Sequence, residues 1–243
     1  MIIPKTAMLL AAGLGTRMLP ITKTIPKPMV KVLNRSLINH ILDRLIEVGV
    51  RRVIVNLYYQ GERLRGHLSH RDDIEILFSE EKERLETGGG IVNALNLIGK
   101  QPFFVINTDS LWLDGPAKAL ERLSEEWKPK TMDGILLLHS TVNAHGYRGL
   151  GDFVVTPDGV LFRRPESYVS PWLFTGIQIL HPRVFKGVSI AKFSLNIIYN
   201  QVIEKERLFG CIHDGEWFHI GTPKALEEAE LFLGNRYSVK KHR

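Results

Sequence analysis

The chain has 243 residues, and 32 Lys and Arg against 26 Asp and Glu give it a net charge of +6. Hydrophobic residues make up 44% of it and charged residues 24%, which excludes a disordered, collagen-like or coiled-coil chain and indicates one large or two small globular domains. Half of the excess positive charge comes from Lys240, Lys241 and Arg243, and no basic run occurs elsewhere. The sequence therefore does not favour a nucleic acid as a partner.

The cysteine content and the length of the apolar runs indicate where in the cell the protein is located. Cys211 is the only cysteine, which excludes an intrachain disulfide and a zinc site built from several cysteines. No apolar run reaches the roughly 18 residues that a bilayer crossing requires, and the apolar stretch at residues 7–12 is too short for the core of a signal peptide. We therefore expect a cytoplasmic protein that binds no membrane.

The first part of the chain alternates short apolar runs with amphipathic segments. Residues 37–48 have apolar side chains at helical spacing, and Gly49 follows as a stop signal. The alternation predicts right-handed βαβ units, and hence an α/β, Rossmann-like three-layer sandwich with a mostly parallel mixed sheet. The predicted strands are residues 7–12, 52–56, 74–78, 103–107 and 134–138, and the predicted helices are residues 37–48, 90–98 and 116–127.

The pattern changes after about residue 140. Turn signals at residues 157–159 and 170–171 separate three short runs that are typical of antiparallel or mixed strands. We expect one domain over residues 1–243, with halves at 1–140 and 141–243 and no linker between them. The predicted strands of the second half are residues 152–156, 160–163, 174–180, 208–213 and 216–220, and its predicted helices are residues 194–205 and 223–233.

A loop rich in small residues follows the first predicted strand. Residues 9–20 read LLAAGLGTRMLP, which lacks the third glycine of a dinucleotide fingerprint and the G-K-[ST] of a Walker A loop. Its small side chains leave backbone N–H groups uncovered, and such groups can cradle phosphate. Arg17, and Lys27 between two prolines, add cations suited to phosphate. The alternative is a tight turn with two surface cations.

The longer motif around this loop favours phosphate binding over a simple turn. Residues 10–20, followed by Thr22 and by Lys27-Pro28, closely resemble the N-terminal signature of the sugar-1-phosphate nucleotidyltransferases. The resemblance implies the nucleotide-diphospho-sugar transferase fold, which is similar to glycosyltransferase-A. It also implies that this loop wraps a nucleoside triphosphate, and that Arg17 and Lys27 are the catalytic residues that hold its phosphates and the developing charge. The nucleotide-binding residues implied in this region are Leu10, Ala11, Ala12, Gly13, Gly15, Thr16, Arg17 and Lys27, together with Asn107.

Two further segments extend the resemblance across the first half. Residues 85–90 read LETGGG and match the family's base-recognition segment, so that Thr87 and Gly88 would face the base. The alternative for this segment is a glycine-rich approach to a helix. Asn107-Thr108-Asp109 resembles the family's N-G-D motif with threonine in place of glycine. Asp109 would then hold Mg²⁺ rather than serve as a cap or turn residue, because a hard cation prefers carboxylate oxygen.

The closing motif departs from the family. Residues 217–223 read WFHIGTP where the family has W-x-D-x-G-T-P, so His219 replaces the second metal-binding aspartate. His219 could ligate a softer ion such as Mn²⁺, because imidazole binds Mg²⁺ poorly. Alternatively, it contacts phosphate or sugar while Asp109 and triphosphate oxygens hold Mg²⁺, or the site is weakened. We favour contact with phosphate or sugar.

The second half carries a resemblance to one subgroup, the N-acetylmuramate-1-phosphate uridylyltransferases. Gly151-Asp152-Phe153 resembles the G-D-F segment of that subgroup, which implies that Asp152 contacts the sugar; the alternative is a simple strand-entry residue. Residues 174–177 match a segment that lies beside the sugar, which implicates Thr175 and Gly176. Residues 1–140 are then the nucleotide-binding half, and residues 141–243 the sugar-binding and accessory half.

The resemblance implies a reaction in which a nucleoside triphosphate and a sugar 1-phosphate give a nucleotide sugar and pyrophosphate. UTP and N-acetylmuramic acid 1-phosphate are the expected substrates, in cell-wall recycling. Mannose-1-phosphate guanylyltransferase, or another sugar specificity, is the alternative with the same chemistry, and a non-catalytic nucleotide-sugar-binding regulatory protein is the alternative from another class. No hexapeptide-repeat region follows residues 223–233, so we expect a monomer or a weak dimer.

Overall fold

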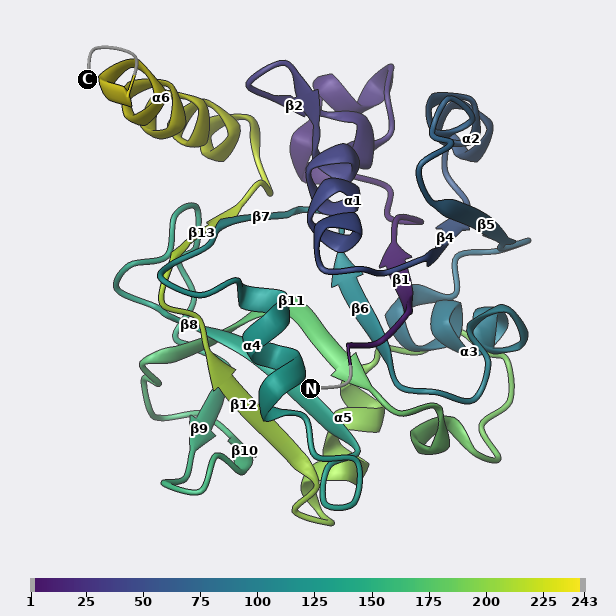
Figure 1. Cartoon of the computed structure of the whole chain (residues 1–243), viewed down its shortest axis with the longest axis vertical. Coiled ribbons are helices and arrows are strands. Elements are labelled where there is room, and N and C mark those ends of the chain that lie inside the picture. Colours follow the sequence, from purple (N-terminus) through teal and green to yellow (C-terminus); the bar gives the residue numbers. More distant parts are fainter. Residues whose placement is uncertain (1–2, 241–243) are drawn as a thin grey trace.

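The computed structural model describes residues 3–240, with side chains as far as residue 236. Its centre is a nine-stranded mixed sheet in which β10, β9, β11, β6, β1, β4 and β5 follow one another, while β8 pairs with β11 and β12 pairs with β8 (Figure 1). The strands of this sheet are β1 (Thr6–Leu10), β4 (Arg52–Leu57), β5 (Glu75–Glu80), β6 (Phe103–Asn107), β8 (Gly134–Ser140), β9 (Phe153–Val155), β10 (Leu161–Arg163), β11 (Trp172–Leu180) and β12 (Leu208–Ile212).

The parallel part of the sheet agrees with the prediction. β1 lies between β4 and β6 and is parallel to both, and β5 continues the parallel order beyond β4. Parallel strands end at the same edge of a sheet, so the segments that follow β1, β4 and β6 meet there. β1 ends at Leu10 rather than residue 12, because Ala11 and Ala12 already belong to the loop beyond it.

β11 reverses the direction of the sheet. It is antiparallel to β6 on one side and to β8 on the other, and its pairing with β8 shifts register between Phe174 and Gln178. Gly176 lies in this irregularity with φ +83°, and a Cβ there would come within 2.8 Å of the Asn107 side chain. Only glycine tolerates both conditions, so the bulge brings β11 against the end of β6.

Helices cover both faces of the sheet. Most buried apolar side chains of α1 (Leu37–Glu47), and those of α2 (Gly61–Leu68) and α4 (Ala119–Glu126), share one hydrophobic cluster with one face of the strands. Those of α3 (Glu86–Ile98) and α5 (Asn196–Ile203) form a second cluster on the other face. This is the predicted three-layer arrangement, although the polar helix α2 was not expected.

A smaller unit closes the end of the sheet at which the parallel strands terminate. β7 (Ser110–Leu113) and β13 (Glu216–His219) form an antiparallel ladder that pairs His219 with Ser110. α6 (Pro223–Lys240) starts where the sequence predicts and runs further; it is the yellow helix of Figure 1, and it packs near the short hairpin of β2 (Lys31–Val32) and β3 (Arg35–Ser36). β7 was not predicted, yet its pairing with β13 fixes the position of His219 beside Ser110.

None of the helices in residues 3–240 combines the length and the apolarity that crossing a membrane requires.

Candidate active site

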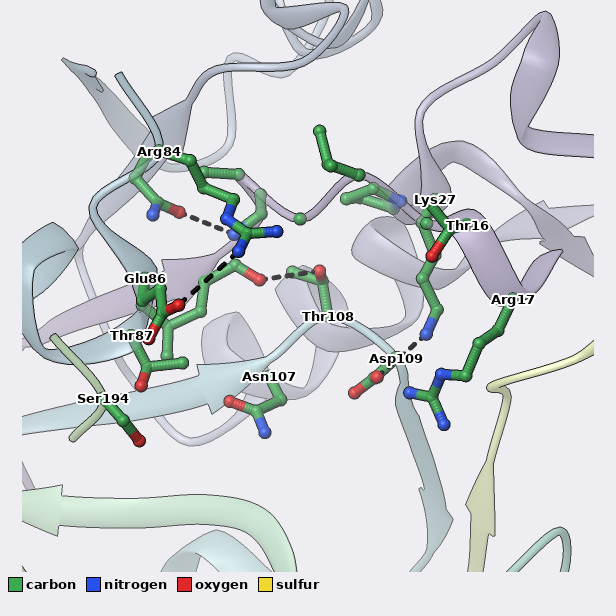
Figure 2. Close-up of a pocket in the computed structure, with 18 residues that line it drawn as sticks. Thr16, Arg17, Lys27, Arg84, Glu86, Thr87, Asn107, Thr108, Asp109 and Ser194 are labelled. Carbon is green, nitrogen blue, oxygen red and sulfur yellow. Dashed lines mark hydrogen bonds and ion pairs between the residues drawn. The ribbon is translucent and has the colours of Figure 1, made fainter. Parts of the chain in front are cut away.

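A cavity of about 570 Å³ lies at the edge of the sheet where β1, β4 and β6 end. Figure 2 shows two ends of this cavity: Arg84, Glu86, Thr87 and Ser194 lie at one, and Arg17, Lys27 and Asp109 at the other, with Asn107 between them. Ten of the eleven residues that the resemblance assigns to the nucleotide line the cavity, namely Leu10, Ala11, Ala12, Gly13, Gly15, Thr16, Arg17, Lys27, Thr87 and Asn107.

The loop after β1 owes its shape to one glycine. Gly15 has φ +66°, and a Cβ there would lie 2.9 Å from Cγ2 of Thr22. The Thr22 hydroxyl donates a hydrogen bond of 2.8 Å to the Gly15 carbonyl oxygen, which fixes the loop against the segment that carries Lys27. A short 3-10 helix at Thr16–Met18 follows and presents Arg17 to the cavity.

Charge gathers at the Arg17 end. Nζ of Lys27 lies 2.9 Å from Oδ2 of Asp109, and only 12% of the Lys27 side chain and 22% of the Asp109 side chain are exposed. Burial alone would raise the pKa of Asp109, but Lys27, with smaller effects of His219 and Arg17, outweighs burial and holds this pKa below its usual value. Asp109 is therefore ionised where it meets Lys27.

His219 completes this end of the site as a neutral ring. Burial lowers the pKa of His219, and Lys27 and Arg17 lower it further, although Asp109 opposes them. Its ring stacks on Trp217, with centroids 6.1 Å apart and planes 18° apart. Nε2 of His219 lies 3.5 Å from a guanidinium nitrogen of Arg17, whereas Nδ1 lies 4.0 Å from Oδ2 of Asp109. The imidazole is thus placed to accept a hydrogen bond from Arg17.

The donor set bears on the expected metal ion. The described residues hold no group of three or more His, Cys, Asp or Glu side chains that could bind a metal by themselves. Asp109 offers a carboxylate to the cavity, and Mg²⁺ is commonly held by one or two carboxylates together with substrate phosphates and water. The Asp109 side chain fits that mode, whereas the His219 nitrogen suits Mg²⁺ poorly.

A second cavity, of about 850 Å³, adjoins the first, and Arg17, Asn107 and Asp109 line both. Thr175 and Gly176, the predicted sugar-binding residues, line it, although the Thr175 side chain is fully buried and its hydroxyl donates to the Leu137 carbonyl oxygen. Other residues that line it include Tyr147, Arg148, Phe174, Trp217, His219 and Lys224.

Asp152 lies behind this second cavity rather than on its wall. Its Oδ2 accepts a hydrogen bond of 2.8 Å from the backbone N–H of Phe174, and Phe174 in turn lines the cavity. The structure thus connects Asp152 to the wall through the strand β11 and not by direct exposure.

The Thr87 end of the first cavity is closed by a segment far away in the sequence. Oγ1 of Thr87 accepts a hydrogen bond of 2.9 Å from the backbone N–H of Leu195. Gly88 donates its N–H to the Phe193 carbonyl oxygen, and a Cβ on Gly88 would lie 2.3 Å from the Phe193 ring. Gly88 is therefore buried under Phe193 and does not line the cavity, unlike Thr87.

Sequence reasoning missed several residues on the wall of the first cavity. Arg84 immediately precedes the LETGGG segment and Glu86 lies within it, so that motif was a signal for them. Asn56 ends the predicted strand 52–56, so its position was a signal for it, whereas Ser194 carried no local signal because only the folded chain brings it to the site.

Comparison with known proteins gives a consistent result. A family model described as nucleotidyl transferase matches residues 6–236. The N-acetylmuramate alpha-1-phosphate uridylyltransferase of Caulobacter vibrioides is 37% identical over 235 residues, which cover 95% of this chain and 97% of that protein. The protein of the same name from Neisseria meningitidis serogroup B is 34% identical, over 94% of this chain and 98% of that protein.

More distant matches follow the same line. A mannose-1-phosphate guanylyltransferase catalytic subunit beta of Drosophila pseudoobscura pseudoobscura is 29% identical over 90% of this chain, but only 59% of that protein is covered. A solved structure of UDP-glucose pyrophosphorylase from Acinetobacter baumanii superposes with a TM-score of 0.81, at 17% identity and with 98% of this chain and 99% of that chain covered. At that identity the likeness shows the fold, and it confirms the fold expected from the sequence.

Proposed function

Because the chain belongs to the nucleotidyl transferase family, we propose that it joins UTP to N-acetylmuramate α-1-phosphate and releases UDP-N-acetylmuramate and pyrophosphate. The enzyme class is a sugar-1-phosphate nucleotidyltransferase. The mannose-1-phosphate guanylyltransferase alternative is less well supported, because its relatives are less similar and are covered over a smaller share of their length. We further propose that the enzyme acts in cell-wall recycling, that it is cytoplasmic, and that Mg²⁺ is its cation.

The observation that carries the proposal is the junction of the two cavities at Arg17, Asn107 and Asp109. A nucleoside triphosphate in the first cavity, with its phosphates at the Arg17 end, would meet a sugar 1-phosphate in the second at this junction. Two substrates held end to end are what in-line displacement at the α-phosphorus requires. We place the nucleotide mainly on residues 1–140 and the sugar mainly on residues 141–243.

The side chains at the junction account for catalysis without a general base. The attacking oxygen of a sugar 1-phosphate is already an anion at neutral pH, so nothing has to remove a proton from it. Arg17 and Lys27 orient the phosphates and offset the charge that builds up in the transition state. Lys27 reaches its position by pairing with Asp109, and Arg17 reaches its position beside His219.

Asp109 would hold the divalent cation together with the triphosphate. When bound, the cation neutralises charge on the phosphates during their displacement. We favour Mg²⁺ over Mn²⁺ because Asp109 supplies a hard oxygen ligand.

The choice of sugar rests on the relatives and on charge. N-acetylmuramate carries a lactyl carboxylate that mannose lacks, and the second cavity has Arg148 and Lys224 on its wall in addition to Arg17. Lys224 is partly neutralised by Glu228, 3.8 Å away, whereas Arg148 has no ion pair among the described side chains of residues 3–236. A spare guanidinium suits a second anionic group on the sugar.

The test is pyrophosphate release by the purified chain with Mg²⁺ or Mn²⁺, over a matrix of nucleoside triphosphates and sugar 1-phosphates. Release with UTP and N-acetylmuramate 1-phosphate supports the proposal. Release with GTP and mannose 1-phosphate instead would transfer the chain to the alternative. If no substrate pair released pyrophosphate while the chain still bound a nucleotide sugar, the chain would be a non-catalytic binding protein in which His219 marks a lost metal site.

A further inference from the structure

A chain of buried hydrogen bonds joins the two loops that form the first cavity. The backbone N–H of Ala11, in the glycine loop, donates to Oδ1 of Asn56 at 2.6 Å. Nδ2 of Asn56 donates to Oε1 of Glu81 at 2.7 Å, and the backbone N–H of Leu85 donates to Oε2 of Glu81 at 2.9 Å. Asn56 is 2% exposed and Glu81 is 7% exposed, so this relay is shielded from water.

One end of the relay, Ala11, lines the cavity, and the other end, Leu85, lies between two residues that line it. Ala11 begins the loop that leads to Arg17 and Lys27, and Leu85 lies between Arg84 and Glu86 at the opposite end. Figure 2 shows Arg84 and Glu86 at one end of the cavity and Arg17 and Lys27 at the other.

Glu81 is an unusual residue to bury at this position. It forms no ion pair with any residue of the described part of the chain, and burial raises its pKa while the bonds from Leu85 and Asn56 partly offset that effect. A buried carboxylate without a cation destabilises a fold, and only its hydrogen bonds compensate. The third glycine of the LETGGG segment makes room for it, because a Cβ on Gly90 would lie 2.7 Å from Oε1 of Glu81 and 2.9 Å from Nδ2 of Asn56.

We propose that Glu81 and Asn56 are positioning residues that hold the base end and the phosphate end of the nucleotide cavity at a fixed separation. A nucleoside triphosphate then occupies both ends at once without first having to order the loops. This inference rests on the proposed function, since it concerns the site that the nucleotide would fill.

The direction of the relay is fixed at both ends. Backbone N–H groups can only donate, so Asn56 must present its oxygen to Ala11, and Glu81 must accept from both Asn56 and Leu85. Glu81→Gln places an NH₂ group against the NH₂ group of Asn56. Asn56→Asp places two carboxylates against each other. The double variant restores every bond: the introduced aspartate accepts from Ala11 and from the introduced glutamine amide, and the glutamine oxygen accepts from Leu85.

The experiment measures the affinities of UTP, uridine and inorganic tripolyphosphate by calorimetry, for the wild-type chain and for Glu81→Gln, Asn56→Asp and the double variant. UTP must bridge both ends, whereas each fragment binds one end only. We expect each single variant to weaken UTP binding about tenfold or more and each fragment by less than about twofold, and the double variant to recover most of the UTP affinity. Asn93→Ala is the matched control, because Asn93 of α3 bonds to Ser79 and Glu80 of β5 without touching the relay.

The outcomes separate the two proposals. If the wild-type chain bound no nucleoside triphosphate, the proposed function would fail and this inference with it. If the wild-type chain bound UTP but the single variants bound it equally well, or lost the fragments to the same extent as UTP, Glu81 would have no positioning role. Single variants that fail to fold leave the comparison between the double variant and the wild type, and a folded double variant without wild-type UTP affinity would overturn the inference.

Discussion

Nζ of Lys27 lies 2.9 Å from Oδ2 of Asp109, across 82 positions of the sequence. The pair joins the segment that follows the glycine loop to the end of β6, at the junction of the two cavities. In the proposed reaction both partners have another task, since Lys27 faces the triphosphate and Asp109 the cation. The ion pair therefore holds both side chains in place until substrate arrives.

Removal of the Arg17 guanidinium should strongly lower turnover. Arg17→Ala deletes a charge that faces both cavities, and the loss of one such group in a preorganised site typically costs on the order of a hundredfold or more in kcat. Asp109→Ala should have a similar effect, because it removes the one carboxylate among the residues assigned to the junction. The measurement is steady-state pyrophosphate release, with circular dichroism as the check on folding.

Lys23→Ala provides the matched control for these variants. Lys23 is an exposed cation in the short helix Ile21–Lys23, and it does not line the first or the second cavity. The variant should turn over at the wild-type rate. Near-normal turnover in folded Arg17→Ala or Asp109→Ala would contradict the assignment of the site.

His219 should make cation binding dependent on nucleotide. With Asp109 as the single carboxylate, Mg²⁺ or Mn²⁺ gains enough oxygen ligands only when the triphosphate is present. His219→Asp adds a second carboxylate close to the first, since Nδ1 of His219 lies 4.0 Å from Oδ2 of Asp109. The variant should bind Mn²⁺ without nucleotide, as measured by the electron paramagnetic resonance of free Mn²⁺, whereas the wild-type chain should not.

His219→Gln is the comparison that separates charge from size. It keeps a neutral polar side chain, so it should resemble the wild-type chain in the absence of nucleotide. Mn²⁺ binding by the wild-type chain alone, at the affinity of the His219→Asp variant, would show that the imidazole is itself a metal ligand.

The parts of the fold and the site that follow from local pattern could be predicted. Arg17, Lys27 and Asp109 lie in motifs at or beyond the ends of buried strands, and parallel strands end together, so their meeting follows from the topology. The comparisons confirmed the family and the enzyme class that these motifs indicate.

Positions that depend on the path of the folded chain could not be predicted. Ser194 reaches the first cavity because residues 193–195 bond to Thr87 and Gly88, more than a hundred positions away. The carboxylate of Asp152, the predicted sugar contact, accepts the N–H of Phe174 on the cavity wall, and no local pattern predicts this bond. α2 escaped detection because its exposed face is strongly polar and only Leu64 and Leu68 are buried.

Arg148 should distinguish an acidic sugar from a neutral one. If its guanidinium pairs with the lactyl carboxylate, Arg148→Ala should raise the KM for N-acetylmuramate 1-phosphate about tenfold, the effect of one charged hydrogen bond. N-acetylglucosamine 1-phosphate lacks this carboxylate, so any turnover of that substrate should be unchanged. Initial-rate measurements with both sugars test this, and an equal change for both would assign Arg148 to the phosphate or to the fold.

His139 should make the fold less stable as the pH falls. Its side chain is buried at 3% exposure, neither ring nitrogen has a hydrogen-bond partner among residues 3–240, and burial lowers its pKa to about 4, with His213 adding to the effect. The unfolded chain protonates this residue near pH 6.5 and the folded chain only near pH 4. Between these values the unfolded state binds more protons, so stability is lost on acidification, by at most about 3 kcal/mol.

The variant His139→Leu removes this titration without removing a hydrogen bond to the protein. The His139 ring packs against His213 and Trp217, so leucine keeps an apolar side chain of similar size there. Urea unfolding should give similar free energies of unfolding for the two chains at pH 7.5, and about 2 kcal/mol more for the variant near pH 4.5. Histidines that do not contact His139 affect both chains equally and cancel in the difference. The same pH dependence in both chains would mean that His139 is already protonated in the fold, or that it finds a partner on acidification.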